Sequence, residues 1–208
     1  MPADFSDPAF LSALLEGCKH AVNEIVSGKS NQATQLLALR KLADEYDEGG
    51  MLTNDQLNLI LRTNVGLVRG YGQWAEDQQH VFAFPARELI RIGYRKVHRD
   101  WPTIWDAARV RLPETKALPS SCGRLIALMD DPIWMEISDF GLPWPPFKYN
   151  SGMGTVGVDW TECLHLSLVQ EGEPTAPPSP PSPKLFPDFE RFLIRTLSEI
   201  NSMSLPQS

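Results

Sequence analysis

His98 is the residue whose surroundings in the sequence best suit acid–base chemistry. It stands in the pattern Arg95-x-x-His98-x-x-Trp101, and spacings of three place side chains on one face of a helix. In a catalytic interpretation, His98 accepts a proton while Asp100 or Asp131 orients its ring. The alternative, which we favour, is a histidine satisfied by hydrogen bonds at the edge of the core.

Other residues that could support catalysis lack the surroundings that such sites need. The glycine-rich run 152–157 is not placed between a strand and a helix, so we expect no nucleotide there. Asp130 and Asp131 could hold a divalent cation, although a helix cap before Pro132 explains Asp131 without metal. The sequence contains no GxSxG or HExxH pattern. We therefore predict no catalytic residues.

The cysteines follow neither a disulfide nor a metal-binding pattern. Cys18, Cys122 and Cys163 are odd in number and widely spaced, and no CxxC pair exists. Buried, reduced thiols are the simplest interpretation. The single pair Cys163-x-His165 is too little for a zinc site. We predict no metal and no cofactor.

Positive charge is concentrated in one short segment. The chain of 208 residues has a net charge of −7, whereas residues 87–111 alone have a net charge of +4. The acidic total argues against a protein that coats nucleic acid with its whole surface. We favour a solvated face paired with the acidic flanks; the alternative is a local contact with DNA or an acidic partner. The residues available for that contact are Arg87, Arg91, Arg95, Lys96 and Arg99.

Hydrophobic residues make up 42% of the chain, enough for one good core. No apolar run approaches the length of a membrane span, and the first residues do not resemble a signal peptide. Six tryptophans could form a ligand platform, but we expect them to fill the core of a small, irregular domain.

The first 80 residues predict three helices. An apolar stripe indicates the first over 8–27, and the second begins with Ser30 or Asn31 as its cap. Leu36, Leu37, Leu42, Ala43 and Tyr46 form the apolar face of the second helix, with Leu39 partly off it. The third runs over 54–78, opened by a capping box at 53–56. Its buried Asn64 is expected to bond the backbone of later loops, and its glycines indicate close helix packing or a bend.

Beyond Pro85 the pattern changes to short, mixed elements. We predict a strand over 88–94, a helical turn followed by a loop over 102–123, and either a strand or the end of a helix over 124–129. After these we predict a short helix over 133–140 that Asp131 caps, a strand over 155–158 and a small helix that Asp159 caps. The predicted fold class is α+β, with an N-terminal helical bundle packed on a small irregular β-sheet.

The C-terminal part is expected to lie outside this domain, which spans residues 1–170 with a helical part over 8–80 and a mixed part over 85–168. Proline-rich residues 171–187 predict a stiff linker. Residues 188–203 predict an amphipathic helix that docks on its own domain or on a partner. Its apolar face includes Phe189, Phe192, Leu193 and Leu197.

Four blocks, in this order, resemble the minor head (head-morphogenesis) proteins of tailed phages, the family of protein F of phage Mu. The resemblance covers about residues 10–153, and each block is weak alone while their order is more specific. The chain departs from the family at Ser151-Gly152-Met153, where cysteines are usual, and in lacking a glycine soon after His98. The matching residues are Arg62, Thr63, Asn64 leading to Gly70–Trp74; Arg95, His98, Trp101; Asp131, Trp134; and Pro145, Pro146, Asn150.

The resemblance implies a structural virion protein of a phage or prophage. Such a protein is expected to act in head morphogenesis near the portal, with portal and capsid proteins as partners and a local contact with packaged DNA. It is expected in the bacterial cytoplasm during assembly and then in the virion head. The alternatives are a cytoplasmic protein-interaction adaptor or, less favoured, an ADP-ribosyltransferase-like or hydrolytic effector that uses His98.

Overall fold

The computed structural model describes residues 8–46, 52–94 and 98–172. Within these ranges the chain forms six α-helices and one three-stranded sheet, which confirms the predicted α+β class. The described residues group into two compact units, 8–68 and 69–172, which we call the first and second units. The predicted docking helix 188–203, with Phe189, Phe192, Leu193 and Leu197, lies outside the described residues, as does all but the start of the predicted linker.

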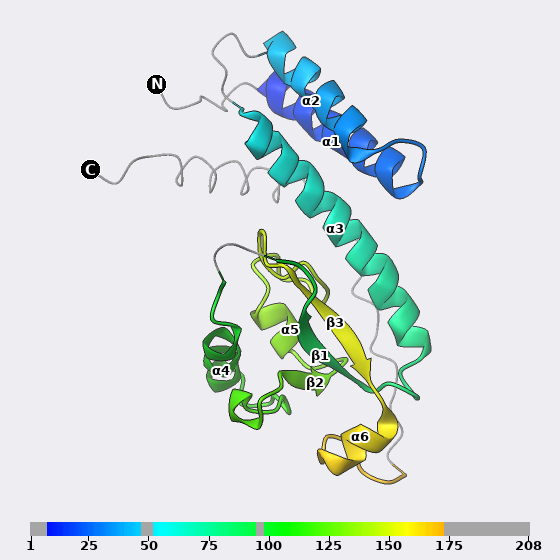
Figure 1. Ribbon diagram of the computed structural model, residues 1–208, viewed down its shortest axis with the longest axis vertical. Coiled ribbons are helices and arrows are strands. Elements are labelled where there is room, and N and C mark those ends of the chain that lie inside the picture. Colours follow the sequence, from blue (N-terminus) through cyan, green and yellow to red (C-terminus); the bar gives the residue numbers. More distant parts are fainter. Residues whose placement is uncertain (1–7, 47–51, 95–97, 173–208) are drawn as a thin grey trace, which may run out of the picture. The chain divides into compact units, whose positions relative to one another are not determined.

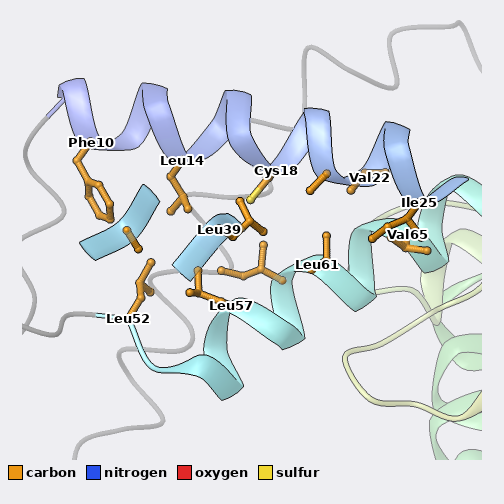
Figure 2. Packing of buried hydrophobic residues seen from close by; sticks show 13 residues of the cluster. Phe10, Leu14, Cys18, Val22, Ile25, Leu39, Leu52, Leu57, Leu61 and Val65 are labelled. Carbon is orange, nitrogen blue, oxygen red and sulfur yellow. The ribbon is translucent and has the colours of Figure 1, made fainter. Parts of the chain in front are cut away.

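Three helices build the first unit, as the apolar periodicity predicted. They are α1 (Pro8–Val26), α2 (Gln32–Tyr46) and the N-terminal part of α3 (Asn54–Gln79). Figure 2 shows side chains of α1 and α3 pointing toward one another, with Leu39 of α2 among them. The centre of this core is fully buried and apolar: Leu14, Cys18, Ala43, Leu57, Ile60 and Leu61.

The face of α2 differs from the predicted one. Leu39, expected partly off the stripe, is buried at 2% exposure, whereas Leu37 is 72% exposed. Leu39 and Ala43 lie one helical turn apart, so they form the buried line of α2 and place Leu37 on the other side. A short helix rich in leucine does not reveal from its sequence alone which leucines face inward.

The helix starts in the first unit are confirmed as predicted. The side chain of Asn31 accepts from the N–H of Thr34 at 2.9 Å. The capping box is complete, since Thr53 N–H donates to Gln56 Oε1 at 2.7 Å and Gln56 N–H donates to Thr53 Oγ1 at 3.2 Å. Each of these bonds satisfies an amide that the first helical turn leaves without a partner.

An antiparallel sheet with the order β2–β1–β3 organises the second unit (Figure 1). Its strands are β1 (Ala86–Arg91), β2 (Ile126–Leu128) and β3 (Met153–Val158). β1 begins two residues before the predicted strand because Ala86 already pairs with Leu128 and Val158. Pairing with β1 also resolves residues 124–129, which the sequence left open between strand and helix.

Helices cover both faces of the sheet. One face packs Leu89, Ala127 and Met153 against α4 (Trp101–Arg111) and α5 (Ile133–Glu136). The other packs Ala86, Ile126 and Val158 against α6 (Trp160–His165) and the turn that follows it. α4 is a full helix rather than the predicted single turn. α5 is shorter than predicted, and a 3₁₀ turn, Ser120–Cys122, lies between α4 and β2.

The Asp159 cap is confirmed, because its side chain accepts from the N–H of Glu162 at 2.9 Å. Within the described residues, no helix is long and apolar enough to cross a membrane.

The thiols should differ sharply in reactivity. Burial raises the pKa of Cys18 to about 12 and, together with Asp159 and Glu162, raises that of Cys163 to about 11, while Cys122 is exposed. Brief alkylation of the native protein near neutral pH should therefore label Cys122 and spare the other two, as read by peptide mass spectrometry. Equal labelling of Cys18 and Cys122 before denaturation would contradict this core.

The burial of Cys18 also makes the free energy of unfolding depend on pH. The folded pKa of Cys18 lies above the value of the unfolded chain, so the folded state holds this proton longer. The stabilisation is complete below about pH 8.5 and is lost as the pH rises toward the folded value. Cys18→Ala should remove that part of the alkaline loss of unfolding free energy.

Candidate functional site

The Gly70–Trp74 part of the first resemblance block meets the last block, at Pro145, in the second unit. A Cβ placed on Gly70 of α3 would lie 1.9 Å from the carbonyl oxygen of Pro145 and 3.0 Å from Cδ1 of Trp144. The helix backbone thus touches the loop backbone directly, which only glycine allows. Of the close helix packing or bend that the glycines indicate, the structure shows close packing at Gly70, against a loop; Gly72 has no neighbour within 4 Å.

Aromatic rings surround this contact. The ring of Trp144 lies 5.3 Å from that of Trp74 and 5.3 Å from that of Tyr71, edge-on to the tyrosine. Trp74 and Trp144 are 3% and 0% exposed. Residues 71 and 74 lie on one side of α3, so the Gly70–Trp74 block forms a surface shaped for the segment around Trp144.

Arg87 lies inside the second unit, not on its surface. It is 1% exposed, and its guanidinium carbon lies 4.8 Å from the ring centroid of Trp134. Its Nη2 donates to the carbonyl oxygens of Met129 at 3.2 Å and Pro143 at 2.9 Å. Burial lowers its pKa to about 10, and the nearby charge of Asp77 acts in the opposite direction. The expectation that Arg87 contacts DNA or a partner is therefore wrong, because its charge is used within the core.

Asp131 has the structural role that the sequence predicts, that of a helix cap. Its carboxylate accepts from the N–H of Ile133 at 2.9 Å, which confirms the cap at the start of α5. The same carboxylate accepts from the hydroxyl of Thr115 at 2.6 Å and the N–H of Lys116 at 2.8 Å. It thereby joins the loop after α4 to the start of α5. No group of three or more potential metal ligands occurs within the described ranges.

Apart from Trp160, which is half-buried, the tryptophans of the second unit are core residues, as the sequence indicates. Trp101, Trp105, Trp134 and Trp144 are each at most 2% exposed. The indole N–H groups of Trp105 and Trp134 donate to backbone oxygens of Leu118 and Leu128 at 2.8 and 2.7 Å. Trp134 also stacks on Phe147 at 5.8 Å, so the Asp131–Trp134 block contacts the segment that follows Pro146.

The block around His98 is not a helix face. α4 begins only at Trp101, and Asp100 caps it by accepting from the N–H of Thr103 at 3.2 Å. The hydrogen bond from the Thr103 hydroxyl, followed by that from the Thr103 N–H, lowers the pKa of Asp100. His98 is exposed and meets the ring of Tyr94 edge-on at 6.2 Å, so it does not lie at a core edge. Asp100 and Asp131 are both engaged as caps, and neither has a recorded bond to His98 within the described ranges.

The remaining basic residues divide into engaged and exposed ones. Arg111 pairs with Glu136 at 2.6 Å, and Arg109 Nε donates to the carbonyl oxygen of Ala117 at 2.8 Å. Arg99 is exposed but donates to the carbonyl oxygen of Tyr149 at 2.8 Å, and Arg91 is exposed at the end of β1. Arg95 and Lys96 lie outside the described residues.

The Arg62–Asn64 block lies in the first unit and serves its core. Thr63 and Asn64 are buried at 5% and 1% exposure, while Arg62 is exposed. Asn64 Nδ2 donates to the carbonyl oxygen of Ile60 at 2.8 Å, one turn back in its own helix. We expected this amide to bond later loops, and the local bond shows that expectation to be wrong.

The other glycine-rich and proline-rich residues are also structural. The run 152–157 lies mostly in β3, so it is a strand rather than a phosphate-binding turn. Asn150 has a positive φ of 52°, which asparagine tolerates better than most residues, and it precedes this strand. The peptide bond between Pro145 and Pro146 is cis.

Comparison with protein-family models, curated proteins and solved structures gave no match to this chain.

Gly70 and Gly72 provide a matched pair of variants. Gly70→Ala should lower the free energy of unfolding by about 1–3 kcal/mol, because the new Cβ overlaps the Pro145 oxygen. Gly72→Ala, in open space on the same helix, should raise it by up to about 1 kcal/mol. Urea unfolding followed by tryptophan fluorescence measures both. Equal effects of the two substitutions would contradict the contact.

Arg87 and Arg91 provide a second pair, on one strand. Arg87→Met should lower the free energy of unfolding by about 1–3 kcal/mol, because two carbonyl oxygens lose their buried donor. Arg91→Met, at an exposed position, should change it by less than about 0.5 kcal/mol. Thermal and urea unfolding distinguish the two, and a neutral Arg87→Met would mean that Arg87 does not bridge these carbonyls.

Proposed function

We propose that this chain is a structural virion protein of a phage or prophage, a minor head protein that acts in head morphogenesis near the portal. The observation that carries the proposal is the packing of resemblance blocks on one another. Gly70 lies against the Pro145 carbonyl, although the two are far apart in the sequence. The blocks that resemble those of a structural protein family thus pack on one another in this chain, and this packing supports a structural role.

The chemistry of the block residues supports this proposal over the effector alternative. Asp131 and Trp134 are buried and hydrogen-bonded to backbone groups, and Trp101 is buried in the same core. His98, the residue on which an effector would rely, is exposed and its recorded contact is with the ring of Tyr94. A protein-interaction adaptor stays the alternative, since it would need the same scaffold.

Few of the basic residues that were expected to contact DNA are exposed in the part of the chain that the structure describes. Of the five residues expected to contact it, Arg87 is buried, and Arg91 and Arg99 are the exposed ones within the described ranges. We therefore propose portal and capsid proteins as the main partners, with any contact to packaged DNA confined to the neighbourhood of these two arginines. The proposed location is the bacterial cytoplasm during assembly and the head of the finished virion.

Interrupting the gene in the phage or prophage that carries it tests the proposal. Infectious titre should fall by orders of magnitude, with aberrant or empty heads in electron micrographs. Mass spectrometry of purified wild-type virions should detect the protein in few copies. A plasmid copy with Gly72→Ala should restore the titre, whereas one with Gly70→Leu should not.

Two results would count against it: virions that lack the protein, or an unchanged titre without it. A second experiment tests the DNA contact with a double variant that carries Arg91→Gln and Arg99→Gln. Normal DNA content in the particles of this variant would contradict the DNA contact without contradicting the role in head morphogenesis.

A further inference from the structure

Within residues 8–46, 52–94 and 98–172, no further strand pairs with the outer edge of β3. The order β2–β1–β3 gives β3 one neighbour, and its whole length, Met153–Val158, pairs with β1. The middle of the strand is exposed: Val156 is 46% exposed, and Gly157 is exposed as well. The outer edge of β3 is therefore the longest unpaired strand edge in the part of the chain that the structure describes.

The direction of the free backbone groups follows from the pairing. Leu89 N–H donates to Leu125 on the β2 side, and Ile92 N–H donates to Gly152 on the β3 side, both at 2.9 Å. Backbone groups alternate along a strand, so Glu88 bonds toward β3, where it lies opposite Val156. The N–H and C=O groups of Thr155 and Gly157 consequently point away from the sheet.

Among the described residues, this edge lacks the features that normally prevent strand pairing. Residues 151–158 contain no charged side chain and no proline. Monomeric proteins usually protect exposed edges with lysine, proline, a bulge or a covering element. The one carboxylate opposite Val156, that of Glu88, is neutralised by Arg124 at 2.6 Å, so it does not repel a neighbour.

We infer that this edge is a homodimer interface, in which β3 pairs antiparallel with β3 of a second copy about a two-fold axis at Val156. Thr155 then faces Gly157 of the partner subunit, and each pair exchanges two N–H···O bonds. The two-fold axis generates a second, equivalent pair, in which Gly157 faces Thr155 of the partner subunit. The N–H and C=O groups of Thr155 and Gly157 that point away from the sheet are therefore all hydrogen-bonded. Val156 faces Val156 of the partner subunit in a non-hydrogen-bonded pair, where the Cα atoms lie about 4.5 Å apart.

A second copy suits this edge better than a different peptide. The two-fold axis makes the hydrogen-bond pattern self-complementary and brings two uncharged edges together. It also joins apolar surface: Ile90 and Ile92 lie on the same face as Val156, and Ile92, 68% exposed, covers Gly154. The dimer would continue this apolar strip across a six-stranded sheet.

Sedimentation of the full chain over micromolar to hundred-micromolar concentrations tests the interface. Wild type should show a concentration-dependent dimer. Val156→Lys places like charges opposite each other at the axis and should weaken the dimer at least tenfold. Val110→Lys, at a valine that is 85% exposed on α4, is the matched control and should dimerise like wild type. Circular dichroism confirms that both variants are folded.

A cross-link tests the register. In a Cys122→Ser background, Val156→Cys should form a disulfide-linked dimer under mild oxidation, since facing residues at a non-hydrogen-bonded site fall within disulfide range. Val110→Cys in the same background should stay largely monomeric. Three results would each overturn the inference. The first is a chain that stays monomeric at every concentration tested, the second is a dimer that Val156→Lys does not weaken, and the third is a dimer that Val156→Cys does not cross-link.

Discussion

A helix backbone and a loop carbonyl meet at Gly70 with no space for a side-chain atom between them. The other interactions of the loop depend on this approach. The carbonyl oxygen of Pro143 accepts a hydrogen bond from Arg87. Trp144 packs on Trp74, and Phe147 stacks on Trp134. A loop of proline and aromatic residues is thereby fixed from several sides at successive positions. It supplies apolar volume that a three-stranded sheet and short helices cannot provide alone.

Arg87 shows how polar chemistry was placed inside this small core. A buried guanidinium is costly unless its donors find acceptors. Here Nη2 of Arg87 donates to the carbonyl oxygens of Met129 and Pro143, whereas the buried Nε has no hydrogen-bond partner among the described residues. The face of Trp134 covers the cation. Because both acceptors belong to irregular segments, one side chain on a regular strand positions two loops. The arginine is thus part of the framework that holds the aromatic loop.

Local signals in the sequence predicted the structure well, and distant ones did not. The caps at Asn31, Thr53 and Asp159 were predictable because donor and acceptor lie within three residues. The burial of Arg87 was not, since its acceptors are 42 and 56 residues away and it opens the segment 87–111, whose net charge is +4. The resemblance blocks pointed to the right residues, but only the fold showed that Gly70 and Pro145 touch.

The paired tryptophans have an optical consequence. The rings of Trp74 and Trp144 are 5.3 Å apart, and those of Trp105 and Trp134 are 5.4 Å apart. Indole transitions at such separations couple when the rings hold a fixed mutual angle, and the coupling vanishes when that angle is averaged. Each pair draws one ring from the loop or short helix that follows β2 and the other from a longer helix. The ellipticity of these chromophores thus reports side-chain order separately from helix content.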